Sequence, residues 1–297
     1  MNDYRKYLQP KVIAQLANIE LKARLVVEGF ITGLHKSPYH GFSVEFAEHR
    51  QYRSGDEIRH IDWKVFGRTE KYFVKQFEEE TNLRSVIALD ASGSMNFASK
   101  DNITKYEYAC YLAGALAYLL IKQRDSVGLA LYDTKINTYL PPRSKQSYIH
   151  EILRNIEATK PSNETHTSKS LDLLAEKISR RGLVVIISDF FDDSESVINA
   201  LKHFRHKKHE VIAFQILDPR EIDFKFGSAA TFKDLETGEE MVTQPYQIQK
   251  TYASTMSDFI SLIKRECYKQ NIDYHLIDTS QPFDKALREF LAKRKRL

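Results

Sequence analysis

The chain has 297 residues, 42% of them hydrophobic and 28% charged, which is typical of a globular protein long enough to bury a sizeable core. Its formal net charge of +4 is too small to indicate binding to nucleic acid or to an anionic membrane surface. The two cysteines, Cys110 and Cys267, are too few for a disulfide framework, so we expect reduced and buried thiols.

The sequence contains no membrane signal of the usual kinds. Its first residues lack the apolar core of a signal peptide, and the longest mostly apolar run, residues 108–121, is shorter than a membrane span. We therefore expect a cytoplasmic protein with no integral membrane segment.

The first 80 residues predict a small N-terminal region. Residues 11–34 place apolar side chains at helical spacing, which predicts a helix. Residues 41–80 alternate aromatic and charged side chains, with turn signals at 54–56 and 67–68, and residues 72–77 have the pattern of a strand. We assign residues 1–80 to a region made of one helix and a β-containing part.

From residue 81 to residue 297, predicted strands and helices alternate. The expected helices include one that opens with a capping box at Thr104 and Glu107. We predict strands at 85–90, 126–133, 135–140, 182–189, 211–217 and 274–277, and helices at 104–123, 144–158, 168–180, 194–206, 250–270 and from 283. Residues 220–246 are turn-rich, with a hairpin tip at 236–239. This alternation predicts an α/β fold with a doubly wound, mostly parallel sheet and helices on both faces.

Oxygen-bearing side chains follow two of the predicted buried strands. One strand ends at Asp90, with Ser92 and Ser94 directly after it, and another ends at Asp189, while Thr165 precedes a predicted helix. In a parallel sheet the two aspartates meet at one edge, where such folds bind ligands. These donors suit a partly hydrated, octahedral Mg²⁺ or Mn²⁺ with an open position. The alternative is that the aspartates only cap the following helices.

The same residues resemble the metal-ion-dependent adhesion site of von Willebrand factor A domains. An upstream block resembles a bacterial family that carries such a domain, known as domain of unknown function family 58. The block comprises Gly33-Leu34-His35-Lys36-Ser37, Gly41-Phe42-Ser43-Val44-Glu45-Phe46, Arg50-Gln51-Tyr52-Arg53-Ser54-Gly55-Asp56, Arg59-His60-Ile61-Asp62-Trp63-Lys64 and Val74-Lys75-Gln76-Phe77-Glu78.

The resemblance implies a von Willebrand factor A-like fold and a specific ligand set. It assigns Asp90, Ser92 and Ser94 to the first metal loop, Thr165 to the second and Asp189 to the third. It also implies a partner, because such proteins are typically encoded beside AAA+ ATPases of the MoxR type.

The second and third metal loops depart from the family pattern. Asn163-Glu164 replaces the usual Gly-Gly, and His166 stands where an Asp often follows, so Thr167 competes with Thr165. The spacing to Leu171 favours Thr165. Phe190 follows Asp189 where many A domains have Gly.

The upstream block also carries charges of alternating sign beside aromatic side chains. We expect an ion-pair and cation–π network that fixes the β-containing part, although a partner surface or a catalytic pocket would use similar residues. The residues concerned are Arg50, Arg53, Asp56, Arg59, Asp62 and Trp63.

Three functions are compatible with these patterns. The leading one is a non-enzymatic, Mg²⁺-dependent protein-interaction module, an adaptor that works with a MoxR-type AAA+ ATPase in chaperone-like assembly and uses an acidic residue of the partner. The alternative is a metal-dependent hydrolase or phosphatase that uses Asp90 and Asp189. Nucleic-acid binding through the basic run at 293–296 is least favoured, because the net charge is small.

Overall fold

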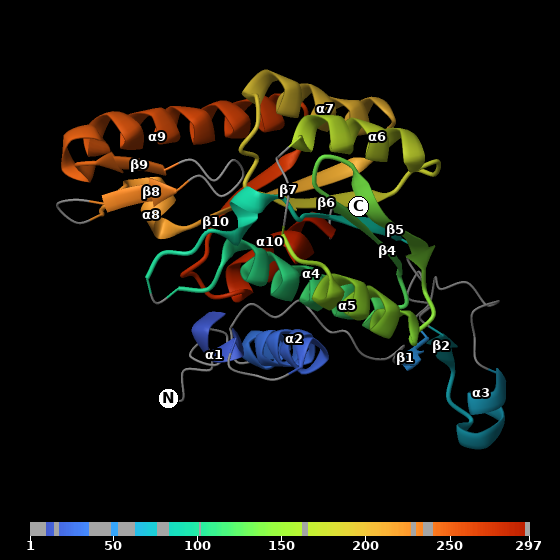
Figure 1. Ribbon diagram of the computed structural model, residues 1–297. Helices are drawn as coiled ribbons and strands as arrows, with labels where there is room; N and C mark the ends of the chain where they lie inside the picture. Colours follow the sequence, from blue (N-terminus) through green and yellow to red (C-terminus); the bar gives the residue numbers. More distant parts are fainter. Residues whose placement is uncertain are drawn as a thin grey trace.

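The structure is a computed structural model. It describes residues 10–14, 18–35, 49–52, 63–75, 83–100, 102–161, 166–226, 230–233 and 240–294. Within these residues a six-stranded sheet forms the centre of the molecule, and helices lie on both of its faces (Figure 1).

The central sheet has the strand order β10-β7-β6-β3-β4-β5. All neighbouring strands run parallel except β4 and β5, which are antiparallel, so the expected mostly parallel sheet is confirmed. The strands are β3 (Arg84–Asp90), β4 (Ser126–Tyr132), β5 (Ile136–Arg143), β6 (Leu183–Ser188), β7 (Glu210–Leu217) and β10 (Asp273–Asp278).

The strand order creates a switch point beside β3. From β3 the chain continues to β4 on one side of it and later returns to β6 on the other side. Open α/β sheets bind ligands at the carboxyl ends of the strands that flank such a switch point, which here are β3 and β6. Asp90 is the last residue of β3.

The central strands are apolar because helices cover both of their faces. Every residue of β6 is buried, as is every residue of β3 except Arg84. On the edge strand β5, by contrast, exposed and half-buried residues alternate. We predicted that β5 ends before Pro141, but it continues through Pro142 to Arg143, because an edge strand tolerates residues that lack a backbone N–H.

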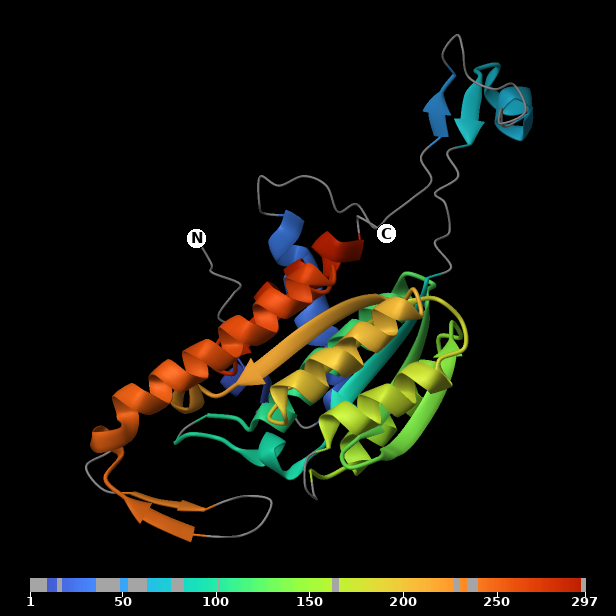
Figure 2. The same cartoon turned by 90° about the horizontal axis from the view of Figure 1, so that it is seen from above.

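Helices cover both faces of the sheet, as a doubly wound fold requires (Figures 1 and 2). One hydrophobic core lies between the sheet and α2 (Ile19–His35), α4 (Lys105–Lys122), α5 (Tyr148–Ala158) and α10 (Asp284–Arg294). The other lies beneath α6 (Thr167–Lys177), α7 (Ser194–His206) and α9 (Pro245–Lys269).

The predicted start of α4 is confirmed in detail. The Thr104 side chain accepts a hydrogen bond from the backbone N–H of Glu107, and the Glu107 side chain accepts one from the backbone N–H of Thr104. Most of α4 is buried between the sheet and its neighbouring helices. A Cβ atom on Gly114 would lie 3.4 Å from the Cβ atom of Ala23 on α2, so α2 and α4 approach closely.

The N-terminal region differs in part from the prediction. The helix expected over 11–34 is described as α1 (Pro10–Ala14) and α2, and the short strands β1 (His49–Gln51) and β2 (Phe73–Lys75) pair antiparallel. The helix α3 (Trp63–Thr69) was not predicted, because its turn signal at 67–68 suggested a loop. Its aromatic side chains pack on each other and on Tyr72, which follows the helix. The ring centroids are 6.0 Å apart for Trp63 and Phe66 and 4.5 Å apart for Phe66 and Tyr72.

The turn-rich segment contains the expected hairpin. A short helix, α8 (Pro219–Asp223), precedes β8 (Ala230–Lys233) and β9 (Glu240–Thr243), which pair antiparallel. The predicted tip at 236–239 lies outside the described residues. None of the described helices has the length and hydrophobicity that crossing a membrane would require.

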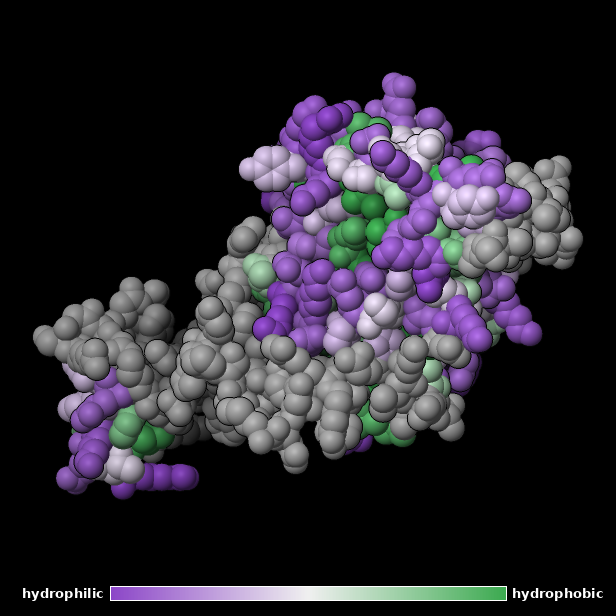
Figure 3. Space-filling view, turned by 90° about the vertical axis from the view of Figure 1, so that its left-hand side faces the viewer, coloured by the Kyte–Doolittle hydropathy of each residue, from purple (hydrophilic) through white to green (hydrophobic). Residues whose placement is uncertain are grey.

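The edge of the sheet at β10 is only partly covered. Five of its six residues are half-buried, and a shallow groove between α9 and β10 is lined by Tyr268, Ile272 and Tyr274. On the side of the molecule shown in Figure 3, hydrophobic side chains gather in the middle and hydrophilic ones surround them.

Candidate functional site

Asp90 joins three segments at the carboxyl edge of the sheet. Its side chain is fully buried, and its Oδ1 accepts a hydrogen bond of 2.9 Å from the backbone N–H of Ser92. Its Oδ2 accepts hydrogen bonds from the hydroxyl groups of Ser188, at 2.6 Å, and Thr167, at 3.1 Å. The end of β3, the end of β6 and the first residue of α6 therefore meet at one carboxyl group.

Asp189 lies beside Asp90 because β3 and β6 are parallel neighbours. Its Oδ2 accepts a hydrogen bond of 2.8 Å from the Ser94 hydroxyl, and the hydroxyl oxygens of Ser94 and Ser92 are 3.2 Å apart. Its Oδ1 accepts a bond from the backbone N–H of Phe191. Four of the five predicted side chains thus form one hydrogen-bonded group, in which Ser94 is the partly exposed member.

The fifth predicted residue, Thr165, lies outside the described residues. Thr167, its competitor, is fully buried and donates to Asp90 as described above. This placement follows from the helix start, because α6 begins at Thr167 and points its first side chain toward the end of β3.

The sequence analysis did not identify Lys105 as part of this group. Its Nζ atom lies 2.6 Å from Asp189 Oδ2 and 2.6 Å from Glu221 Oε1, and 4.5 Å from the centroid of the Phe191 ring. The Lys105 side chain is fully buried. One indication of Lys105 was present in the sequence, which is that a charged residue stands in the first turn of a mostly apolar helix. Glu221 had none, because only the tertiary structure brings α8 to this edge.

The group carries more negative than positive charge. Burial, and next the charge of Asp189, raise the pKa of Asp90 to about 6. Burial also raises the pKa of Glu221 to about 7, although Lys105 opposes this shift. Burial disfavours the Lys105 ammonium group, but Asp189 and Glu221 more than offset it and raise its pKa. Three carboxyl groups therefore share one ammonium group, which leaves two excess negative charges when all are ionised.

The residue after Asp189 has an unusual backbone conformation. Phe190 has a φ of 59°, in the left-handed region that suits glycine. Its backbone N–H donates to the Ser188 hydroxyl at 2.8 Å, and its ring is fully buried. A glycine would reach this conformation without strain, whereas Phe190 reaches it with its ring buried.

The donor set fits a hard divalent cation. Two carboxylates and the hydroxyl groups of Ser92, Ser94 and Thr167 offer oxygen atoms only, as Mg²⁺ prefers. In the part of the chain that the structure describes, Asp90 has no basic partner, and no cluster of three or more His, Cys, Asp or Glu side chains could hold a metal. An ion at this edge would therefore depend on the hydroxyl groups.

The predicted network of the upstream block stays a prediction. Arg53, Asp56, Arg59 and Asp62 lie outside the described residues, and only the backbone of Arg50, in β1, is described. Trp63 begins α3 and is 57% exposed, so it is not part of a buried core.

Comparisons with known proteins place the chain among uncharacterised relatives. The family described as "Protein of unknown function DUF58" matches residues 48–258. Uncharacterized protein Mb1516 from Mycobacterium bovis and Uncharacterized protein Rv1480 from Mycobacterium tuberculosis are each 30% identical over 235 residues, which cover 77% of this chain and 72% of each relative.

Two solved structures are similar over most of the chain. One is the conserved hypothetical protein BatB from Bacteroides thetaiotaomicron, with a TM-score of 0.47 and 17% identity over 72% of this chain and 100% of that chain. The other is an aerotolerance-related membrane protein from Bacteroides fragilis, with a TM-score of 0.48 and 18% identity over 71% and 99%.

Proposed function

This chain belongs to the DUF58 family of proteins of unknown function, and we propose that it is a non-enzymatic, metal-dependent protein-interaction module. One observation carries the proposal. Asp90 and Asp189 are buried side by side among hydroxyl groups, and together with Glu221 and Lys105 they form a group of three carboxyl groups and one ammonium group. A divalent cation would balance this charge.

The cation would be held by side chains from three loops. They are Asp90, Ser92 and Ser94 after β3, Asp189 after β6, and Thr167 or Thr165 before α6. The hydrogen bond from Thr167 to Asp90 supports Thr167, and Thr165 stays the other candidate. A bound Mg²⁺ would supply an open position for an oxygen atom of another molecule, and the partly exposed Ser94 marks the side of approach.

The strand order supports a proposed fold, and the open position of the metal supports a proposed partner. The switch point at β3 and the antiparallel edge strand β5 support a von Willebrand factor A-like arrangement. We expect the open position to accept a carboxylate of a partner protein, either a MoxR-type AAA+ ATPase or its client, so that this chain acts as an adaptor. Metal binding and partner binding would then be thermodynamically linked.

Titration calorimetry with MgCl₂ tests the metal site directly. We expect saturable binding to the wild-type chain and at least about tenfold weaker binding to Asp90→Asn and Ser94→Ala. Asp258→Asn is the matched control, because it makes the same chemical change on the exposed surface of α9. If Mg²⁺ does not bind, or binds equally to Asp90→Asn, the proposal is wrong.

A capture experiment tests the interaction. A purified MoxR-type ATPase should bind the immobilised wild-type chain in Mg²⁺, and binding should be lost in EDTA or with Asp90→Asn. Equal binding in all three conditions would contradict a metal-dependent adaptor.

The alternative function, a metal-dependent hydrolase or phosphatase, is tested by a separate activity measurement. His166 is exposed and forms no hydrogen bond with either aspartate in the described part of the chain, so His166 does not pair with these carboxylates as a base. Turnover of p-nitrophenyl phosphate with Mg²⁺ or Mn²⁺, abolished by Asp90→Asn, would favour the alternative and contradict the non-enzymatic proposal.

A further inference from the structure

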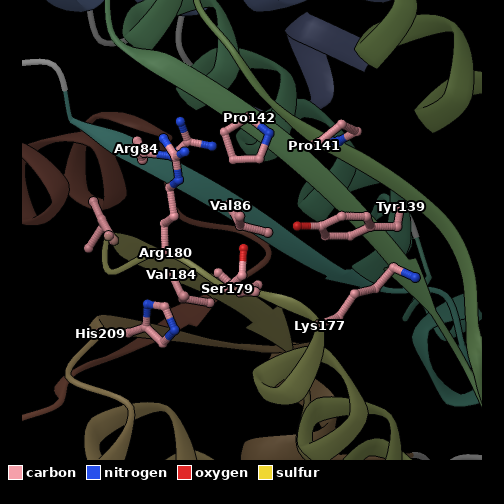
Figure 4. Close-up of a pocket in the computed structure, with 13 residues that line it drawn as sticks. Arg84, Val86, Tyr139, Pro141, Pro142, Lys177, Ser179, Arg180, Val184 and His209 are labelled. Carbon is pink, nitrogen blue, oxygen red and sulfur yellow. The ribbon is translucent and has the colours of Figure 1, made fainter.

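A second hollow lies at the opposite end of the sheet from Asp90 (Figure 4). It is formed where β3 and β6 begin, where β5 ends and where the chain leaves α6. Its volume is about 200 Å³, and Val86 and Val184 contribute apolar side chains to its wall. It shares no residue with the group around Asp90.

Three cations line this hollow. Arg84 comes from β3, and Lys177 and Arg180 come from the end of α6 and the loop that follows it. None of the described residues lining the hollow is acidic, and none of the three cations forms an ion pair with a carboxylate among the described residues. Figure 4 shows Arg84 and Arg180 on the same side of the hollow. Within the described part of the chain, their positive charges therefore lie together without a carboxylate partner.

Neutral hydrogen-bonding groups complete the lining. The Tyr139 and Ser179 hydroxyl groups point toward the middle of the hollow (Figure 4). Burial raises the pKa of Tyr139 and the charge of Arg84 opposes the rise, so Arg84 acts on the Tyr139 hydroxyl. Lys177 Nζ lies 5.2 Å from the centroid of the Tyr139 ring.

His209 provides a buried polar atom at the same place. Its side chain is 1% exposed, and its Nδ1 forms no hydrogen bond with a described residue. Burial lowers the pKa of His209, although the backbone groups of Gly182 and Ile178 oppose this shift. A buried nitrogen of this kind is costly unless a partner satisfies it. An oxyanion in the hollow would be such a partner for the Nδ1–H tautomer.

We propose that this hollow binds a phosphate group, as free inorganic phosphate or as part of a small phosphate monoester. Two guanidinium forks match the oxygen atoms of a phosphate, and the hydroxyl groups can donate to the remaining ones. The volume is below the range of about 300–1,000 Å³ typical of larger organic ligands, so it suits a compact anion. The competing account is that Lys177 and Arg180 only complement the negative end of α6, but it leaves Arg84 unexplained, because Arg84 comes from a strand.

Titration calorimetry with sodium phosphate at constant ionic strength tests the proposal. We expect one saturable site in the wild-type chain and at least about tenfold weaker binding to Arg84→Gln and to Arg180→Gln. Arg154→Gln removes the same charge from the exposed surface of α5 and should bind phosphate like the wild type. Asp90→Asn should also bind it normally, since the two sites are separate.

Two outcomes would overturn the proposal: no saturable binding of phosphate, or equal weakening by Arg84→Gln, Arg180→Gln and Arg154→Gln, which would indicate general electrostatics. Thermal melting of each variant checks that it is folded. Ribose 5-phosphate, with ribose as the control, distinguishes the sources. Tighter binding of the ester than of phosphate assigns the site to a monoester, and equal or weaker binding assigns it to the free anion.

Discussion

At the scale of single residues, the main feature is a set of buried charges that are incompletely paired. Asp90 and Asp189 are fully buried, and the single positive charge of Lys105 is shared by Asp189 and Glu221. Buried charges are retained at a cost in stability, which is typical of sites that bind a ligand. Two substitutions measure this cost.

Asp90→Asn should stabilise the chain in EDTA at pH 7.5. The folded-state pKa of Asp90 is about 6, above its ordinary value of 3.8, so the folded state binds more protons than the unfolded state between these values. Its stability therefore falls as the pH rises through this window, and Asn removes a penalty of about 3 kcal/mol. Chemical denaturation at pH 4 and pH 7.5 tests this. A variant that is less stable than the wild type at pH 7.5 without metal would contradict the prediction.

Lys105→Met should destabilise the chain strongly. The substitution leaves the Asp189 and Glu221 carboxyl groups buried without their cation, and breaking a buried pair costs about 3–5 kcal/mol. The loss should shrink as the pH falls from 8 to 5, because the pKa of Glu221 is about 7 and its protonation removes one of the unpaired charges. Lys122→Met, on the exposed last turn of the same helix, should change the stability by less than about 0.5 kcal/mol. Similar losses for both variants would argue against a special role of Lys105.

At the scale of elements, the close approach of α2 and α4 makes the N-terminal helix part of the main core. Ala23 on α2 is fully buried beside Gly114 on α4, and Val26 and Val27 belong to the same hydrophobic core as the sheet. The predicted boundary between the N-terminal region and the rest of the chain, at residue 80, stays a prediction. Helix α2 lies before this boundary and packs on α4, which lies after it.

Ala23→Leu should weaken this helix pair. A larger side chain at the contact forces α2 away from α4 and should cost about 1–3 kcal/mol of unfolding free energy. Leu21→Ala is the control, because Leu21 is 44% exposed on the same helix and should have little effect. Denaturant unfolding followed by tyrosine fluorescence and by circular dichroism would check both. An Ala23→Leu variant as stable as the wild type would mean that α2 is dispensable for the core.

At the scale of the whole molecule, two hydrophobic cores lie on opposite faces of one sheet, and two candidate sites lie at opposite ends of its strands. Cys110 lies in the core under α4, and Cys267 lies in the core under α9. Each thiol therefore reports on the opening of one face. Both cysteines are free and buried, as expected from the sequence.

Neither thiol should react with a disulfide reagent in the native protein at pH 8. Burial raises the pKa of each thiol to about 12, so almost no thiolate is present, and access is blocked as well. In denaturant, Cys110→Ser and Cys267→Ser variants should gain reactivity at the same midpoint if the two faces unfold together. Midpoints that differ between the two variants would show that the faces open independently.

The sequence by itself determined the pattern of elements and the chemical nature of the candidate site. Hydrophobic runs, the capping box at Thr104 and the alternation of strands and helices are local signals, and most predicted elements are present with shifted ends. The carboxylates Asp90 and Asp189 could be placed at one edge because parallel neighbouring strands leave no other arrangement. The helix α3 escaped prediction, since ring packing stabilises it despite a turn signal.

Only the tertiary structure decided which groups share charge. Lys105 and Glu221 meet at Asp189 although 116 positions separate them, and Arg84, Lys177, Arg180 and His209 meet at the other edge from separate elements. Such groupings have no local signal, because burial and the Coulomb energy of a pair depend on distance in space and not on spacing along the chain. The sequence could therefore name the donors of the candidate metal site, but not the ammonium group that shares it or the cationic hollow at the far end of the sheet.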